Sequence, residues 1–305
     1  MAAYVFRKLI QSTLLILGVL ILVFFMVRLT GDPVALMVSR EATNAQREAM
    51  RVALGFDRPL PVQFADYLGG VLGGDLGQSL RLGLPNAMLI SQRLPATFEL
   101  ALASLAVALV VAVPLGVLGG MHPGSPLDSV GRGLGLAGQT IHSVWLSMIL
   151  ILIFAVQLRW LPSFGRDGWQ SLILPTIALS LGSIGQLVRL TRSTVLEIRR
   201  ENFVRTAHAK GLSGQRVAYS HIAPNVAIPL ISVIGVGFTY SLGGSVYIES
   251  VFAWPGLGSL LSNAIRDSDF PLVQSITIFI ALFAIIINLL TDLLYGIFDP
   301  RIRQR

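Results

Sequence analysis

Six long apolar runs constrain this chain more than any other feature of its sequence. A helix needs about 20 consecutive apolar residues to cross the hydrocarbon core of a bilayer. The chain contains six such runs, at 9–29, 97–121, 134–158, 172–190, 226–248 and 272–297. Of its 305 residues, 53% are hydrophobic and only 13% are charged, which is too apolar for an ordinary soluble protein. The sequence therefore predicts an all-α membrane protein with six transmembrane helices.

The first apolar run is expected to remain part of the protein. It follows Arg7 and Lys8, a basic start that is typical of secretory signal peptides. The run is longer than the apolar region of a usual signal, and no A-x-A-like cleavage pattern follows it. We interpret it as an uncleaved first helix.

The placement of Lys and Arg predicts the orientation, because short cytoplasmic loops are enriched in these residues. With both termini cytoplasmic, the inner segments hold thirteen of them and the short outer loops hold three. The outer segment 28–93 holds seven more, but long segments cross largely regardless of charge. The inner group is Arg7, Lys8, Arg132, Arg189, Arg192, Arg199, Arg200, Arg205, Lys210, Arg216, Arg301, Arg303 and Arg305, and the outer group is Arg159, Arg166 and Arg266. The net charge of +7 thus indicates membrane topology rather than nucleic-acid binding.

The sequence carries no pattern for a metal site or for nucleotide hydrolysis. It contains no cysteine, and its four histidines match no H-E-x-x-H spacing. A P-loop needs Lys directly after Gly, whereas Lys8 follows Arg7 and Lys210 follows Ala209. We predict that the chain itself binds no metal or other cofactor and cannot hydrolyse ATP.

The spans divide the chain into three parts. Residues 1–30 hold the N-terminus and first helix, 31–96 form an extracytoplasmic segment, and 97–305 form a five-helix membrane core with a cytoplasmic loop near 193–225. The outer segment is too long for a simple connection and should contain helices. A capping-box pattern, Thr43 with Gln46, predicts the start of one of them. The segment is either a docking platform for an outer partner or a cap on the helix bundle.

Two helical stripes of small and polar residues are candidates for a translocation path. Gln139, Ser143 and Ser147 are spaced four residues apart in the third span, and Thr239 lies between two glycines at the same spacing in the fifth. Such residues in membrane helices mostly serve close packing and interhelical hydrogen bonds. Packing is therefore the more common explanation for each of them, and Gln139 is the strongest path candidate.

Charged residues within the spans lie near their ends. They are Glu99, Arg189, Glu249 and Asp292. Buried proton or sodium relays normally need acids near the middle of the membrane, so this distribution argues against a secondary transporter. The outer loop after Glu249 contains Phe252 and Trp254, which suit the membrane interface, and it is either a re-entrant cap or a gate.

A polar, basic, helix-forming segment, 201–213, lies between two apolar spans. Ala207 and Gly211 are four residues apart, so on one helix they would share a face and permit close approach of a partner. Arg205 and Lys210 would supply polar contacts. From charge alone, a solvated loop is an equal alternative.

Ten short motifs, in order, resemble the dipeptide/oligopeptide/nickel family of ABC-importer permeases. They are Gly31-Asp32-Pro33, the run 54–60, Gly74-Asp75-Leu76-Gly77 with Ser79, Leu94-Pro95-Ala96-Thr97, Trp160-Leu161-Pro162, Ile173-Leu174-Pro175, Arg205-Thr206-Ala207 with Ala209-Lys210-Gly211, Gly243-Gly244-Ser245, Trp254-Pro255-Gly256 and Asp299-Pro300. The resemblance covers nearly the whole chain. It implies a type I importer permease fold in a bacterial inner membrane. It also implies a homologous second permease, two cytoplasmic ATPase domains that use ATP and Mg, and an extracytoplasmic solute-binding protein.

The resemblance also implies a coupling helix from Arg205 to Leu212 that docks on the ATPase. The residues assigned to it are Phe203, Arg205, Thr206, Ala207, His208, Lys210, Gly211 and Leu212. Two positions depart from the family pattern. His208 stands where many relatives have Arg, and His142 stands where many have Pro, so the proline that would explain a kink in the third helix is missing.

The leading hypothesis is a permease subunit of an ATP-driven importer for peptides or a related small solute such as a nickel chelate. The alternative is a secondary transporter or channel acting alone. An intramembrane enzyme is disfavoured, since no G-x-S-x-G element is present. The identity of the cargo is left open by the sequence.

Overall fold

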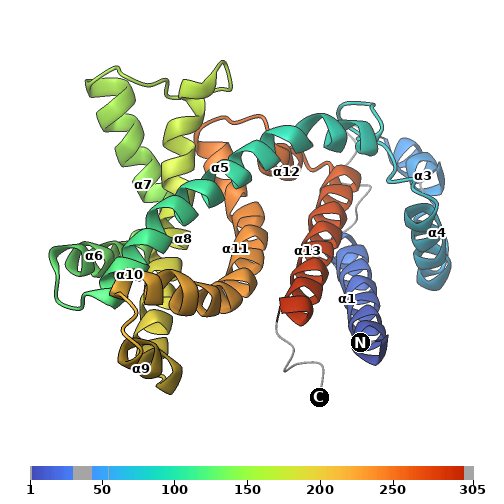
Figure 1. Ribbon diagram of the computed structural model, residues 1–305. Coiled ribbons are helices and arrows are strands. Elements are labelled where there is room, and N and C mark those ends of the chain that lie inside the picture. Colours follow the sequence, from blue (N-terminus) through green and yellow to red (C-terminus); the bar gives the residue numbers. More distant parts are fainter. Residues whose placement is uncertain (1, 30–42, 54, 299–305) are drawn as a thin grey trace. The chain divides into compact units, whose positions relative to one another are not determined.

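The computed structural model describes residues 2–29, 43–53 and 55–298. These residues are helical apart from turns, bends and one isolated β-bridge between Gln78 and Pro85 (Figure 1). The predicted all-α fold class is therefore confirmed. The helices are α1 Ala2–Leu29, α3 Asn44–Ala53, α4 Leu60–Leu72, α5 Asn86–Met121, α6 Pro126–Thr140, α7 Ser143–Leu150, η1 Ile151–Gln157, α8 Trp169–Ile198, α9 Asn202–Ala209, α10 Gly214–Val217, η2 Ala218–Ile222, α11 Ala223–Val251, α12 Leu257–Arg266 and α13 Phe270–Phe298. The motifs 31–33 and 299–300 lie outside the described residues.

The chain forms two compact units, each built from segments that are distant in sequence. The first unit comprises Ala96–Pro255 and Ile287–Arg305, and the second comprises Ala2–Pro95 and Gly256–Ile286. Helices α5 and α13 contribute to both. The division into 1–30, 31–96 and 97–305 is a statement about membrane topology and stays a prediction.

Five helices of the described chain are long and apolar enough to cross a membrane. They cover Phe6–Phe25, Asn86–Met121, Trp169–Ile198, Ala218–Val251 and Phe270–Thr291. Five of the six predicted apolar runs fall on these helices. Since their hydrogen bonds are satisfied within each helix, they meet the main requirement for a chain in lipid.

The third predicted span is broken, so the expectation of a single helix over 134–158 is wrong. Helix α6 and the α7–η1 helix that follows meet at an angle of 106°. Between them, Ile141 and His142 have extended backbones, with ψ angles of 118° and 133°. The Nδ1 atom of His142 accepts a hydrogen bond from the N–H of Val144 at 3.4 Å and caps α7. A sharp bend is present although His stands where many relatives have Pro.

A seam of glycines lets α6 cross α8 at very short range. Gly131, Gly135 and Gly138 lie on one face of α6, because they are four and three residues apart. A Cβ atom added at Gly138 would lie 2.4 Å from the carbonyl oxygen of Leu181 and 2.9 Å from the Cα of Gly185. The two backbones therefore pack directly on each other, as in other small-residue contacts between membrane helices.

Helix α5 packs on α8 in the same way. Added Cβ atoms at Gly116 and Gly120 of α5 would lie 2.5 Å from Thr191 and 2.6 Å from Val195 of α8. Helix α8 is thus held closely by two neighbours. The core around it consists of Ala108, Ala112, Ile184, Leu187, Val188, Val195, Val204, Ala207, Val217, Ile222, Val226 and Leu230.

The loop after α11 closes on the core of the first unit rather than on lipid. Phe252 and Trp254 are 1% and 0% exposed, so their expected place at the membrane interface is wrong. The indole N–H of Trp254 donates to the carbonyl of Ala96 at 2.8 Å, which satisfies the one polar atom of this buried ring. Nearby, Arg166 pairs with Glu99, with an Nε to Oε2 distance of 2.8 Å.

In the second unit, the outer segment contains helices, as predicted. Thr43 and Gln46 form the predicted capping box: the N–H of Gln46 donates to the Thr43 hydroxyl at 3.3 Å, and the N–H of Thr43 donates to the Gln46 side chain at 2.9 Å. Helix α4 packs on α1 through rings, with the centroids of Phe24 and Phe64 5.1 Å apart. Helix α4 of this segment is therefore packed within its unit.

A buried carboxylate, Asp269, joins residues 79–81 to the start of α13. Asp269 is 1% exposed and accepts hydrogen bonds from the Ser79 hydroxyl at 2.5 Å and from the backbone N–H groups of Leu80 and Arg81, each at 3.3 Å. These donors offset the loss of water around the charge. The contact joins segments nearly 190 residues apart in sequence.

We expect Gly138→Ala to destabilise the protein by about 1–3 kcal/mol, because its Cβ atom would overlap the backbone of α8. The matched control is Gly133→Ala on the same helix, where an added Cβ meets nothing within 4 Å. Thermal unfolding of the purified protein in detergent measures both. Equal unfolding temperatures for the two variants would contradict the direct backbone contact.

Candidate functional site

The polar segment 201–213 forms a short helix that is attached to the end of α8. The predicted coupling helix, Arg205 to Leu212, is displaced in the structure: α9 begins at Asn202 and ends at Ala209. In Figure 1, α9 lies at one end of α8, while α7 lies beside the other end. Two side chains of α9, Val204 and Ala207, are buried in the core of the first unit. The helix is therefore fixed to the unit by one apolar face.

Gly211 ends this helix instead of sharing a face with Ala207. Its φ angle is +78°, in the left-handed region that favours glycine. The N–H of Gly211 donates to the carbonyl of His208 at 2.9 Å, and that of Leu212 donates to the carbonyl of Ala207 at 3.3 Å. These two bonds form a Schellman motif. The expectation that Ala207 and Gly211 jointly form a contact face for a partner is wrong, since Ala207 faces the core.

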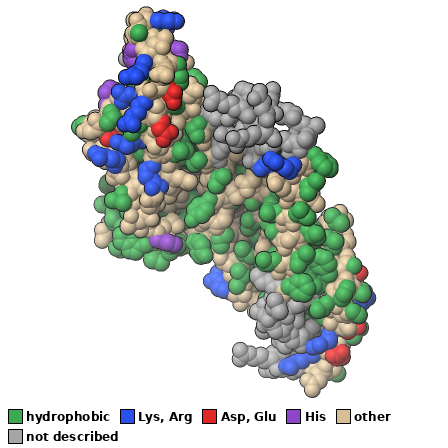
Figure 2. Space-filling model, turned by 90° about the horizontal axis from the view of Figure 1, so that it is seen from below, with side chains coloured by type: hydrophobic (Ala, Val, Ile, Leu, Met, Phe, Trp, Pro, Cys, Tyr) green, Lys and Arg blue, Asp and Glu red, His purple; other side chains and the backbone are tan. Residues whose placement is uncertain are grey.

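The remaining predicted coupling residues lie on the surface. Phe203 is 42% exposed, which is unusual for a large apolar side chain on a polar helix. The other exposed members of the set are Arg205, Thr206, His208, Lys210 and Gly211, while Leu212 is half-buried against the core. Figure 2 shows Lys and Arg side chains gathered over the end of the first unit that carries α6 and α9. This end is therefore a basic surface that includes the exposed ring of Phe203.

Two arginines at the end of α8 connect this surface to neighbouring helices. Arg192 pairs with Asp128 of α6, whose side chain is 1% exposed, at 2.5 Å. Arg199 donates to the carbonyls of Gly120 and Met121, the last residues of α5, at 2.8 and 2.7 Å. Cations near the C-terminal carbonyls of a helix are favourable. The sequence analysis did not identify Asp128, because it lies just before the third apolar run.

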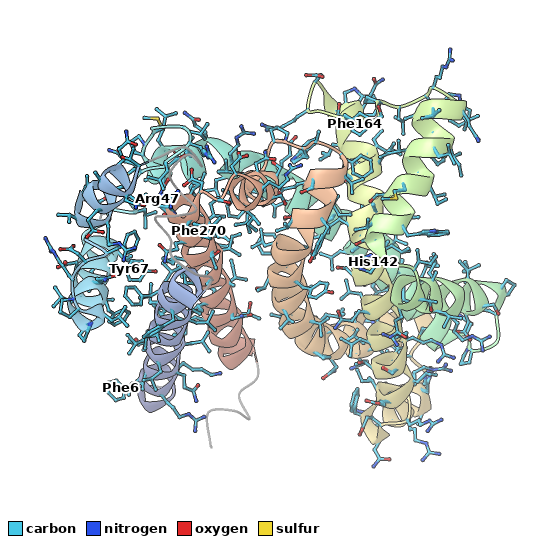
Figure 3. The ribbon with its side chains drawn as sticks, turned by 180° about the vertical axis from the view of Figure 1, so that it is seen from behind. Phe6, Arg47, Tyr67, His142, Phe164 and Phe270 are labelled. Atoms are coloured by element: carbon cyan, nitrogen blue, oxygen red, sulfur yellow. The ribbon has the colours of Figure 1, made fainter. Side chains whose placement is uncertain are left out.

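A second candidate site is a cavity of about 290 Å³ at the break between α6 and α7. Gln139 and Ser143 line it, together with His142, which lies where the two helices meet (Figure 3). The opposite walls come from α8 and α11. The full lining is Gly138, Gln139, Thr140, Ile141, His142, Ser143, Ala178, Leu179, Leu181, Gly182, Ser183, Tyr240, Ser241, Gly244 and Tyr247.

The break divides the predicted polar stripe, so that two of its residues border the cavity and the third is buried. Gln139 lies in the last turn of α6 and Ser143 begins α7, so they border the cavity without sharing a helical face. Ser147 is fully buried, and its hydroxyl donates to the carbonyl of Ser143 at 2.8 Å. Thr239 donates to the carbonyl of Gly235 at 3.2 Å and does not line the cavity. The predicted path residues therefore include only two cavity residues.

The sequence analysis missed the wall that α11 contributes. Tyr240, Gly244 and Tyr247 are four and three residues apart, a spacing that places them on one helical face. The two rings are 78% and 63% exposed. Exposed tyrosines at this spacing around a glycine are a signal that could have identified the wall.

Comparisons with known proteins identify the family. Residues 112–304 match the family described as "Binding-protein-dependent transport system inner membrane component", and residues 1–101 match its N-terminal counterpart. The chain belongs to this family of binding-protein-dependent permeases. The resemblance found in the sequence is thereby confirmed, and this chain is a membrane-embedded transport subunit rather than a catalytic one.

Curated relatives align with this permease over nearly its whole length. A probable peptide ABC transporter permease, y4tP, of Sinorhizobium fredii is 36% identical over 99% of this chain and 100% of its own. The glutathione transport system permease GsiC of Pectobacterium atrosepticum is 37% identical over 100% of both chains. The oligopeptide transport system permease AppB of Bacillus subtilis is 36% identical over 99% of both.

Two solved structures share the fold. Both are inward-facing conformations of the MetNI methionine ABC transporter, with TM-scores of 0.56 and 0.58 and identities of 17% and 16%. Each covers 70% of this permease and 97% of the compared chain. The type I importer permease fold is thus confirmed.

We expect Gly211→Ala to loosen the end of α9, because a non-glycine residue in the left-handed region costs about 1–2 kcal/mol. Amide hydrogens of α9 should then exchange about tenfold faster. Hydrogen exchange followed by mass spectrometry measures this. The control is Gly214→Ala, where an added Cβ meets nothing within 4 Å. Similar exchange in both variants would refute the proposed glycine cap.

We expect a cysteine at position 139 to react with a water-soluble maleimide and a cysteine at position 147 to be protected. Gln139 borders the cavity, whereas Ser147 is fully buried. The natural chain has no cysteine, so there is no background labelling. Protection of position 139 in every nucleotide state of the assembled transporter would rule out its place on a water-filled path.

Proposed function

We propose that this permease is one of two subunits that form the membrane path of an ATP-driven peptide importer. The observation that carries the proposal is the full-length match to relatives named for peptide, oligopeptide and glutathione transport. Glutathione is itself a small tripeptide, so the three names share one chemical class. A nickel chelate, the other cargo considered from the sequence, has no support among these names.

The remaining components of the importer are part of this proposal. The family name implies a solute-binding protein outside the membrane, and the likeness to the MetNI transporter supports a partner ATPase and a second permease. ATP and Mg would be used by the ATPase, because this chain has no P-loop. The excess of Lys and Arg in the expected inner segments supports a cytoplasmic position for both termini.

Helix α9 is the proposed contact with the ATPase. Its buried face, Val204 and Ala207, attaches it to the permease core, so a force on α9 reaches the core instead of bending a loose loop. Its surface presents Phe203 and Arg205, an aromatic and a cationic side chain of the kinds enriched in protein interfaces. The Schellman cap at Gly211 shapes the end of this docking helix.

A transporter acting alone receives less support. Among the side chains that the structure describes, two acids of the first unit are buried, and both have partners: Asp128 pairs with Arg192, and Glu249 accepts a hydrogen bond from Thr97 at 2.8 Å. Neither lines the cavity at the helix break. A proton-coupled carrier would need a titratable acid in contact with its path.

The test is reconstitution of this permease with its cognate second permease, ATPases and binding protein in liposomes. ATP-dependent peptide uptake is expected, with no uptake and no ATP hydrolysis by this chain alone. Uptake of peptide by the isolated chain would overturn the proposal in favour of a secondary transporter.

We expect Thr206→Trp to reduce co-purification of the ATPase at least tenfold, because Thr206 is exposed on α9 and a large ring there should clash with the docked partner. The variant should still insert in the membrane. The control is Asp167→Trp in an exposed loop predicted on the outer side. Normal ATPase recovery and normal uptake with Thr206→Trp would refute docking at α9.

A further inference from the structure

We propose that the cavity at the α6–α7 break is a cargo subsite that binds an uncharged main-chain segment of the peptide through neutral hydrogen-bonding groups. This inference rests on the proposed peptide import. It assigns to the permease itself a contact with cargo, and it names the part of the peptide that is recognised.

A serine hydroxyl on the α11 wall is open to the cavity and makes no bond to the described residues. Ser241 of α11 lines the cavity and is 2% exposed, and its hydroxyl has no hydrogen-bond partner within residues 2–29, 43–53 and 55–298. A hydroxyl that is open to a cavity and makes no bond to the described residues can bond to a polar group that enters the cavity. Ser245, one helical turn away, is fully buried too, but its hydroxyl donates to the carbonyl of Leu242 at 2.8 Å. Of Ser241 and Ser245, the one that borders the cavity is the one whose hydroxyl makes no bond to the described residues.

The other polar groups around the cavity are also neutral and available. Gln139 supplies an amide, Ser183 a hydroxyl, and Tyr240 and Tyr247 supply phenols. Helix α6 ends beside them. The last carbonyl groups of a helix accept no hydrogen bond from N–H groups of that helix, so they can accept one from a ligand. A peptide group, which has one N–H donor and one C=O acceptor, can bond to both kinds of group.

The charge of the lining excludes other ligand classes. Among the fifteen residues that border the cavity, none is Lys, Arg, Asp or Glu, and His142 is the one titratable imidazole. A peptide terminus or charged side chain would enter without a counter-charge, so no lining residue would offset the loss of its hydration. Ala178, Leu179 and Leu181 add apolar wall, suitable for an aliphatic side chain.

The size of the cavity agrees with a partial contact. Its volume of about 290 Å³ lies just below the range of about 300–1,000 Å³ typical of small-molecule sites. The cavity is therefore suited to one segment of a peptide rather than to a whole oligopeptide. Recognition of main-chain groups makes no demand on side-chain identity, which suits a path for cargo of varied sequence.

The experiment compares Ser241→Ala with its matched control, Ser245→Ala, in the reconstituted importer. At saturating peptide-loaded binding protein, Ser241→Ala should lower the maximal uptake rate about three- to tenfold and leave the unfolding temperature unchanged, since no internal bond is lost. Ser245→Ala should leave uptake within twofold. Equal uptake rates in the two variants would overturn the subsite.

Gln139 tests the class of ligand. Gln139→Leu and the isosteric but charged Gln139→Glu should both lower uptake of an uncharged peptide, because neither retains the amide donor. If the site instead accepts a cationic group, Gln139→Glu will raise uptake of a lysine-containing peptide. That result would overturn recognition of neutral main-chain groups.

A photocrosslinking amino acid at position 139 identifies the occupant directly. Crosslinks to radiolabelled peptide are expected in the assembled transporter, and the control at Trp145, which is 57% exposed and does not line the cavity, should give none. Crosslinks only to the second permease would show that a partner side chain fills the cavity and would overturn the proposal. Absence of ATP-dependent peptide uptake in the wild type would instead reject the proposed function, so the two failures are distinguishable.

Discussion

The backbone contact between α6 and α8 is the constraint on which the first unit depends. Gly138 has no room for a Cβ atom, and a Cβ atom added at Gly185 would lie only 3.0 Å from the Cα of Gly138. This contact holds the end of α6 against α8, and the chain then turns by 106° into α7. The turn leaves polar groups and a cavity at the point where a straight helix would have presented a closed, hydrogen-bonded surface. In lipid, such irregular backbone is tolerated where protein or a water-filled cavity surrounds it, and the break therefore marks a site rather than a defect.

Much of this architecture could be predicted from the sequence, because apolar runs report which segments can be surrounded by lipid. The break at Ile141 and His142 was missed, because the polar residues Gln139 and Ser143 were interpreted as a stripe on one continuous helix and His142 does not carry the fixed φ angle of a proline. The glycines at 131, 135 and 138 were the better signal, because their spacing marks a face that packs without side chains. Trp254 was misplaced for a related reason: an indole suits both an interface and a core, and only the tertiary contact with Ala96 decides between them.

The candidate sites were predicted with unequal success. The segment 201–213 could be identified by its polarity between apolar spans, but its inward face could not, because Val204 and Ala207 are buried by contacts with distant residues. At the cavity, Gln139 and Ser143 were found from their residue type, whereas Ser241 was missed. A single serine in an apolar helix usually bonds to its own backbone, as Ser245 does, and the sequence does not distinguish the two.

Helix α8 connects the two candidate sites within one unit. It lines the cavity at Leu179 to Ser183 and meets the α9 segment at Val195 to Ile198. From Ser183 to Ile198 the helix rises about 22 Å, at about 1.5 Å per residue. Its glycine contacts with α5 and α6 leave little room for sliding, because close-packed backbones resist small displacements. A rotation imposed at α9 would therefore move the wall of the cavity as part of a rigid helix, which gives the proposed ATPase contact a physical route to the proposed cargo subsite.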